Sequence, residues 1–191
     1  MKLYHGSAAG GIQTLEPRLA DHGQPYLYLT TLREVAAIYL TDGGERPCYW
    51  FPYGYTRDGR AVYYELWPGG LREVSEGRSG WLYTVEVEED GLLPLDSNPR
   101  ARLSTRPLAV AEAEHVPDVY AWLLEAESQG RMVLFRYEQF TPEQLAWWHR
   151  DILAEARAKH VLDIPEHPFA RLVREKFPQL WRELGEGGSK G

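Results

Sequence analysis

Hydrophobic and polar positions alternate in short runs through the first two thirds of the chain. The clearest run is residues 80–89 (GWLYTVEVEE), where Leu82 and Thr84 oppose Tyr83 and Val85. Alternation with a period of two is typical of a β-strand. Shorter β-prone runs predict further strands at residues 2–7, 25–31, 106–116 and 131–140.

The aromatic stretch at residues 48–68 contains an Asp58-Gly59 dipeptide with rings on both sides. Asp-Gly is a frequent two-residue turn between antiparallel strands, because glycine adopts the backbone angles that the turn needs. This stretch is therefore expected to form a β-hairpin.

Helical spacing replaces alternation at residues 32–41, where Leu32, Val35, Ala36 and Tyr39 fall on one face. Thr31 is expected to cap this helix, and Glu34 stands at the third helical position of a capping box.

Three more helical segments follow, at residues 117–129, 141–160 and 167–184. The second has a strong start, because Thr141 can cap, Pro142 suits the first helical position and Gln144 completes a capping box. Pro178 is expected to break or kink the last segment.

A strand-rich first part and a helical last part predict an α+β fold. Without a repeat or a linker, residues 1–184 are expected to form a single domain. The glycine-rich residues 185–191 are expected to be a disordered tail.

The net charge of −7 disfavours nucleic-acid binding through a broad basic patch, since phosphate contacts need clustered Lys and Arg. Seven Trp and twelve Tyr indicate a ring-rich core or an aromatic-lined cleft. The single cysteine, Cys48, fits a reducing compartment, so we expect a cytoplasmic protein. We expect no membrane span, because no stretch approaches about 20 apolar residues. No His and Cys spacing favours a metal site.

Candidate chemistry begins at the end of the first predicted strand, where His5, Gly6 and Ser7 follow each other. A second stretch places Tyr28 on a strand and Tyr39 on the next helix, with small alanines between them. A helix that folds back on its strand can bring both phenol rings to one cavity, which would suit a flat aromatic ligand. The alternatives are an ordinary polar residue at a strand end for His5 and core aromatics for the two tyrosines.

These two stretches resemble the ADP-ribosyltransferase superfamily, and most closely the diphtheria-toxin and poly(ADP-ribose) polymerase branch with its His, Tyr, Glu signature. The opening is also similar to that of RNA 2′-phosphotransferases, which share the fold, and of bacterial proteins that begin with the same LYHGS. The resemblance implies a split β-sheet core with a helical C-terminus. It also implies NAD as a substrate and an acceptor that is a protein, a nucleic acid or a small molecule.

The resemblance further implies roles for individual residues. The peptide groups of Gly6 would clamp the nicotinamide carboxamide, and Ser7 would add a hydroxyl contact. His5 would bind ribose hydroxyls, Tyr39 would stack on the nicotinamide and Tyr28 would close the other side. Thr30, on the same strand as Tyr28, is expected among the NAD-binding residues.

The glutamate of the signature has no obvious counterpart. The resemblance of HVPDVY (residues 115–120) to the 2′-phosphotransferases puts that position near Arg106, which suits a phosphate better than a developing cation. Glu112 and Glu114, two apart on one predicted strand, are the preferred substitutes, and Glu138 is a third. The alternative for each is a solvated charge at a strand edge.

Three functions remain open from the sequence. The first is NAD-dependent ADP-ribosyl transfer through His5 and Tyr39 with Glu112 or Glu114. The second is removal of a 2′-phosphate from RNA with Arg106. The third is a binding module for NAD or ADP-ribose without catalysis. Trp147, Trp148 and His149 are expected to be mainly structural, as are Cys48 and the hairpin aromatics, although the hairpin could form a lid over a flat ligand.

Overall fold

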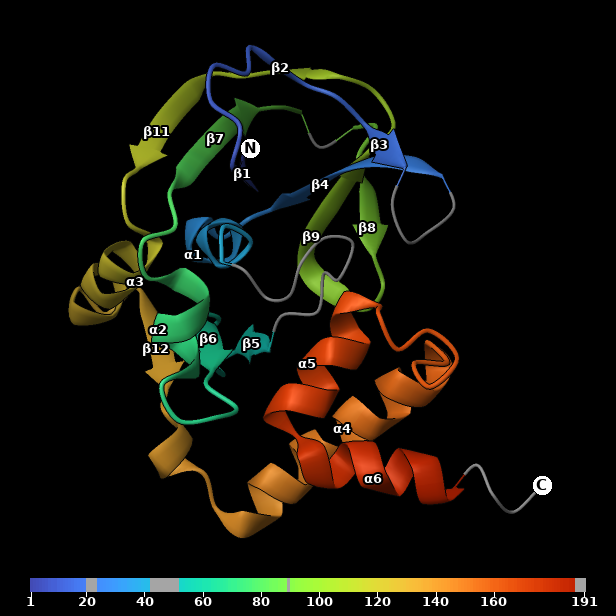
Figure 1. Cartoon of the computed structure of the whole chain (residues 1–191). Helices are drawn as coiled ribbons and strands as arrows, with labels where there is room; N and C mark the ends of the chain where they lie inside the picture. Colours follow the sequence, from blue (N-terminus) through green and yellow to red (C-terminus); the bar gives the residue numbers. More distant parts are fainter. Residues whose placement is uncertain (20–23, 42–51, 89, 188–191) are drawn as a thin grey trace.

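The computed structural model describes residues 1–19, 24–41, 52–88 and 90–187 of the chain (Figure 1). Its largest unit is an antiparallel sheet with strand order β11-β7-β1-β4-β9-β8, in which β3 also pairs with β4. Its strands are β1 (Lys2–Ser7), β3 (Arg18–Leu19), β4 (Pro25–Thr30), β7 (Gly80–Glu86), β8 (Leu93–Leu95), β9 (Asn98–Ser104) and β11 (Glu112–Val116). Two short strands, β2 (Thr14–Leu15) and β10 (Leu108–Ala109), pair with each other beside it.

A second sheet has the order β12-β6-β5, with β12 (Met132–Phe135) parallel to β6 (Ala61–Tyr64) and β5 (Tyr53–Tyr55) antiparallel at the edge. Helix α1 (Arg33–Ile38) lies between the two sheets and contacts β1, β4 and β6 (Figure 1). Helices α2 (Gly70–Ser75) and α3 (Val119–Ser128) complete this layer. The main hydrophobic core joins α1, α3 and the inner face of the small sheet.

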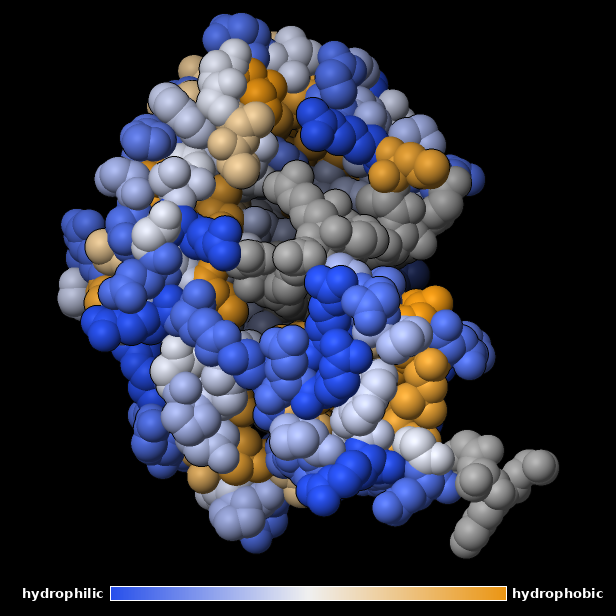
Figure 2. Space-filling view, in the orientation of Figure 1, coloured by the Kyte–Doolittle hydropathy of each residue, from blue (hydrophilic) through white to orange (hydrophobic). Residues whose placement is uncertain are grey.

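The C-terminal helices form a separate layer below the small sheet (Figure 1). They are α4 (Pro142–Ala158), α5 (Pro168–Lys176) and α6 (Pro178–Gly187), preceded by the short 3₁₀ helix η1 (Tyr137–Gln139). Their apolar faces meet in a second core around Ile152, Phe169 and Phe177. Hydrophobic residues lie on the surface over the segment between α4 and α5 (Figure 2). In this segment, Leu162 and Ile164 are each 42% exposed.

Most expected elements are confirmed, including the strand–helix–strand order, the hairpin between β5 and β6, and the break at Pro178. The α+β class is also confirmed. Thr141 accepts a hydrogen bond from the Gln144 backbone N–H, and Gln144 bonds back to the Thr141 N–H, so this capping box forms as expected.

The predicted cap of α1 is wrong. Leu32 is the N-cap residue, with extended backbone angles and no side-chain cap bond. Instead of Thr31, the residue before it accepts the bond: the Thr30 hydroxyl accepts a hydrogen bond from the Leu32 N–H at 3.2 Å. The helix starts later than the pattern suggested, because this turn leads the chain out of β4 and back across the sheet.

Other differences concern boundaries. The expected strand at residues 106–116 is divided into β10 and β11, and the hairpin of β8 and β9 was not expected. Helix α6 continues to Gly187, so residues 185–187 are helical rather than part of a tail, and 188–191 lie outside the described residues. In the described part of the chain, no helix is long and apolar enough to cross a membrane.

Candidate functional site

Strands β1 and β4 diverge just where the sequence places His5 and Gly6. The two strands share a single register pair, Tyr4 with Thr30. From there β1 continues along β7 as far as Ser7, whereas β4 continues along β9. From His5 onward, the edge of β1 that faces β4 therefore has no ladder partner on β4, and this edge is called the opening below.

The peptide groups of Gly6 point toward this opening. Met1 exchanges two backbone hydrogen bonds with Val87, the residue that follows β7: the Met1 nitrogen donates to the Val87 carbonyl, and the Val87 N–H donates to the Met1 carbonyl. In an antiparallel ladder alternate residues bond to opposite neighbours. Gly6, an odd number of residues from Met1, therefore directs its N–H and C=O away from β7.

Gly6 also lets helix α1 approach the sheet closely. A Cβ atom at this position would lie only 2.1 Å from the carbonyl oxygen of Ala36. Any other residue would collide with the helix backbone. The glycine thus has a packing role, whatever its peptide groups bind.

His5 reaches across the opening to β4. Its Nδ1 lies 2.9 Å from the carbonyl oxygen of Tyr28. A carbonyl can only accept, so Nδ1 carries the proton and donates. In the neutral ring Nε2 is then an acceptor. The imidazole takes the Tyr28 carbonyl that would otherwise continue the ladder between the two strands.

Tyr28 and Tyr39 lie on the helix side of the sheet. Tyr28 is two residues before Thr30, so both side chains project from the face of the sheet that carries Tyr4 and α1. His5 pairs with Tyr83 on β7, and its side chain leaves the strand on the opposite face. Tyr39 ends α1 as its C-cap residue. Burial raises the pKa of the Tyr39 phenol, against the lowering effect of its hydrogen bond with Tyr53. Because Tyr39 as a whole is 40% exposed, the raised pKa reflects the surroundings of its hydroxyl rather than of the whole ring.

A tyrosine and asparagine network extends this cluster, and nothing in the sequence except the aromatic hairpin indicated it. The hydroxyl of Tyr39 is 3.3 Å from that of Tyr53, and their rings meet edge to face at 6.0 Å. Asn98 on β9 donates to the Tyr53 hydroxyl at 2.8 Å and accepts from the Tyr55 hydroxyl at 2.7 Å. Burial raises the pKa of Tyr53 and raises that of Tyr55 to about 12. The phenols therefore stay neutral and fixed in orientation.

Three other expected NAD-binding residues make local contacts. The Ser7 hydroxyl accepts from the Ala9 N–H at 3.2 Å at the end of β1. The Thr30 side chain is buried and serves the turn before α1. Arg106 donates to the Asp90 carbonyl at 3.4 Å in an exposed position beyond β9. Ser7 is two residues after His5 on β1 and therefore lies near the opening. The contacts of Thr30 and Arg106 do not place either side chain beside the His5 imidazole.

The two expected catalytic glutamates lie elsewhere. Glu112 and Glu114 are on β11, with β7 between them and β1. Glu112 is exposed and accepts from Lys2 at 3.2 Å, which is the main cause of a raised Lys2 pKa. Glu114 forms an ion pair with Arg33 and accepts from the Trp122 indole N–H at 3.1 Å. The structure therefore does not bring either carboxylate to His5, Tyr28 or Tyr39.

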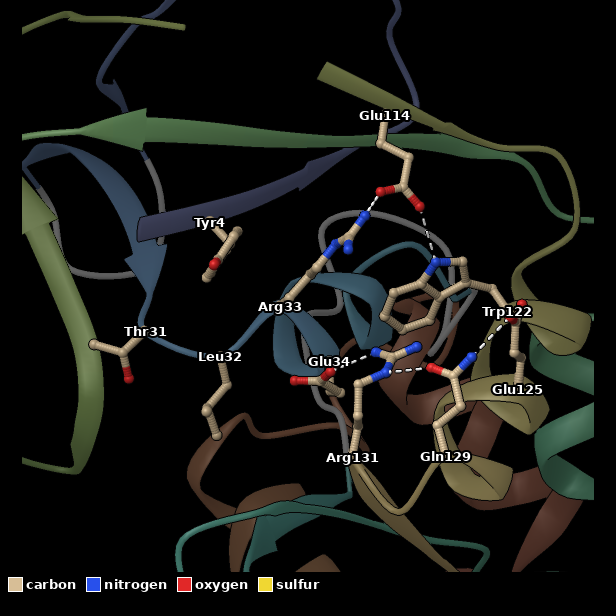
Figure 3. Close-up of a pocket in the computed structure, with 10 residues that line it drawn as sticks. All are labelled: Tyr4, Thr31, Leu32, Arg33, Glu34, Glu114, Trp122, Glu125, Gln129 and Arg131. Carbon is tan, nitrogen blue, oxygen red and sulfur yellow. Dashed lines mark hydrogen bonds and ion pairs between the residues drawn. The ribbon is translucent and has the colours of Figure 1, made fainter. Parts of the chain in front are cut away.

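Glu114 lines a charged cavity of about 550 Å³ between the start of α1, β11 and α3 (Figure 3). The Trp122 ring lies near two guanidinium groups, with Arg131 at 4.9 Å and Arg33 at 5.7 Å from its centroid. Arg131 also pairs with the buried Glu34 at 2.6 Å. Figure 3 shows these charges turned toward one another, so they stabilise the packing of α1 against α3.

The remaining candidates are scattered. Glu138 is exposed in η1. Cys48 and the first hairpin aromatics, residues 49–51, lie outside the described residues. Trp147 and Trp148 line a second cavity, described below. Within the described ranges, no three His, Cys, Asp or Glu side chains gather as a metal site would require.

Neither a family model, nor a curated protein, nor a solved structure matches this chain.

Proposed function

We propose that this protein binds NAD at the divergence of β1 and β4 and transfers ADP-ribose to an acceptor with release of nicotinamide. One observation carries the proposal. The peptide groups of Gly6 face the opening beside a His5 imidazole of fixed tautomer, and Tyr28 and Tyr39 lie on the helix side of the same sheet.

The nicotinamide would sit against Gly6. Its carboxamide has one acceptor and two donors, and the C=O and N–H of Gly6 offer the matching pair on an edge free of ladder pairing with β4. Tyr39 offers a neutral ring for stacking, since burial keeps its phenol protonated at ordinary pH. Ser7, the last residue of β1, would contact the carboxamide from the far end.

The ribose would lie beside His5. Because the Tyr28 carbonyl holds the Nδ1 proton, Nε2 of the neutral ring would accept a hydrogen bond from a ribose hydroxyl. This contact orients the sugar for cleavage of its bond to nicotinamide.

A second function is NAD binding without turnover, and one observation favours it. Glycosidic cleavage builds positive charge on the ribose, which a carboxylate would stabilise. Glu112 and Glu114 are instead paired with Lys2 and Arg33 on the other side of β7. The 2′-phosphotransferase alternative gains no support, because Arg106 donates to the Asp90 carbonyl.

Two measurements on the same protein separate these functions. Titration calorimetry with NAD is expected to give saturable binding that Tyr39→Ala weakens about tenfold, as expected for the loss of stacking and ring burial. His5→Ala is expected to weaken it as well, whereas Leu162→Ala, an exposed truncation between α4 and α5, serves as the control. Nicotinamide release, followed by chromatography with a cell lysate as the source of acceptor, then distinguishes transfer from binding alone. Absence of NAD binding to the folded protein would contradict both.

A further inference from the structure

A second cavity of about 550 Å³ lies on the outer face of the small sheet. By the register of this sheet, Gly54, Val62 and Tyr64 point away from the main core, and the start of α4 closes the cavity from the other side. This volume falls within the range of about 300–1,000 Å³ that small-molecule sites occupy.

The cavity is lined by rings and carries no charge. Seven of its twelve described lining residues are aromatic, and none is charged. Tyr64 and Trp148 meet at 5.1 Å between centroids, and Trp147 stands at 4.9 Å from Trp148, nearly perpendicular to it. The charged cavity beside Trp122 has the opposite character, with two arginines and three glutamates in its lining. The two cavities thus suit different ligands.

Gly54 keeps the floor of the aromatic cavity open. A Cβ atom there would lie 3.3 Å from the Tyr64 ring, so a larger side chain would push against that ring. At the mouth, Trp147 remains 53% exposed, although its ring is large and apolar. A flat ligand between these rings would bury the exposed indole face.

Two side chains at the mouth of the aromatic cavity carry hydrogen-bond donors that no described residue uses. The capping box fixes the Gln144 side chain, because its Oε1 accepts the Thr141 N–H at 2.9 Å. Its amide NH₂ and the Trp147 indole N–H have no hydrogen-bond partner among the described residues, and both residues line the cavity. A ligand that uses them needs acceptor atoms on a flat, uncharged ring.

We propose that this aromatic cavity binds an uncharged heteroaromatic ring, and specifically the base of a nucleoside. A sugar alone fits poorly, because its hydroxyls need more polar partners than the lining offers. A cation without acceptor atoms would leave the Gln144 amide and Trp147 indole donors of the lining unpaired. The net charge of −7 disfavours a polymer with many phosphates, so the base arrives on a small molecule.

The test uses the full-length protein and four probes: adenosine, guanosine, cytidine and uridine. Titration calorimetry is expected to show saturable binding of at least one of them. Trp147→Ala is expected to weaken that binding about tenfold, the loss typical of one base–aromatic stack. Leu162→Ala truncates another exposed apolar side chain at a distance from the cavity and controls for folding. Gly54→Val, which fills the floor, should abolish binding.

Two competitions make the outcome decisive. Excess nicotinamide should leave nucleoside binding unchanged, which keeps this cavity separate from the proposed NAD site, and the result stands even if NAD does not bind. Indole, a flat ring without an acceptor atom, should bind at least tenfold more weakly than the preferred nucleoside. The proposal is overturned if no nucleoside binds the folded protein, if Trp147→Ala binds as tightly as the parent chain, or if indole binds equally well.

Discussion

The His5 imidazole joins β1 to β4, with its Nδ1 2.9 Å from the Tyr28 carbonyl oxygen, at the point where the backbone pairing of the two strands ends. This contact links residues 23 positions apart. A side chain thus takes over the role of a ladder hydrogen bond, and the ring is held at the opening with one nitrogen already committed.

The His5 tautomer can be observed directly. Because a carbonyl accepts but cannot donate, the neutral His5 ring is expected to carry its proton on Nδ1 rather than on Nε2. Long-range proton–nitrogen correlation spectra of protein with ¹⁵N-labelled histidine would identify the nitrogen that carries the proton. Deprotonation at Nδ1 would contradict the contact.

Gly6→Ala is expected to destabilise the fold strongly. The new Cβ would lie 2.1 Å from the Ala36 carbonyl oxygen, and helix α1 would have to move. We expect the free energy of unfolding to fall by about 3 kcal/mol, at the upper end of the usual cost of overpacking. Urea denaturation measures it, with Gly185→Ala as the control, since nothing lies within 4 Å of the added methyl there. Equal stability of the two variants would show that α1 does not rest on Gly6.

Arg131→Met is expected to destabilise the protein, because it leaves the buried Glu34 carboxylate without its partner. Glu34 is 8% exposed, and Arg131 binds it at 2.6 Å. We expect the free energy of unfolding to fall by about 2 kcal/mol. This is below the usual cost of breaking a buried ion pair, because Arg131 itself is partly exposed. The double variant Glu34→Met with Arg131→Met should recover most of it in thermal unfolding. If the double variant is no more stable than Arg131→Met, the ion pair is not the source of the loss.

Glu112→Gln and Glu114→Gln are expected to leave NAD affinity and any nicotinamide release unchanged. Both carboxylates are paired away from the opening, with Lys2 and Arg33. Each substitution should lower stability by less than about 1 kcal/mol, as for exposed ion pairs. Calorimetry and the release assay check this together. A variant that binds NAD normally but no longer releases nicotinamide would return that glutamate to catalysis.

Stability is expected to fall at alkaline pH because of the tyrosine network. Burial raises the pKa of Tyr39 and Tyr53, and raises that of Tyr55 to about 12. In the unfolded chain a tyrosine loses its proton near pH 10. The stabilisation by Tyr55 is therefore complete below pH 10 and is lost as the pH rises from 10 to about 12, since the unfolded state then binds fewer protons than the folded state. Denaturation curves between pH 8 and 11 should show this decline, and Tyr55→Phe should make it shallower. A slope that is the same in both proteins would exclude a contribution from Tyr55.

Local patterns in the sequence determined most of the elements. Alternation identified β7, helical spacing identified α1, and the start signals identified α4, whose Thr141 capping box formed as expected because its two partners are three residues apart. The same local information placed His5 and Gly6 at the end of the first strand, whereas Tyr39, expected within a helix over residues 32–41, is the C-cap residue of the shorter α1. The Thr31 cap failed because the turn that leads the chain back over the sheet engages Thr30 instead.

Tertiary structure alone decided the surroundings of these residues. The charge of Glu114 is neutralised by Arg33, 81 positions earlier, and Asn98 fixes two tyrosines of the hairpin more than 40 residues before it. The divergence of β1 from β4 depends on which neighbour each strand pairs with after Tyr4. Such choices depend on the packing of both sheets around α1, and the periodicity of a single segment contains no information about its partners.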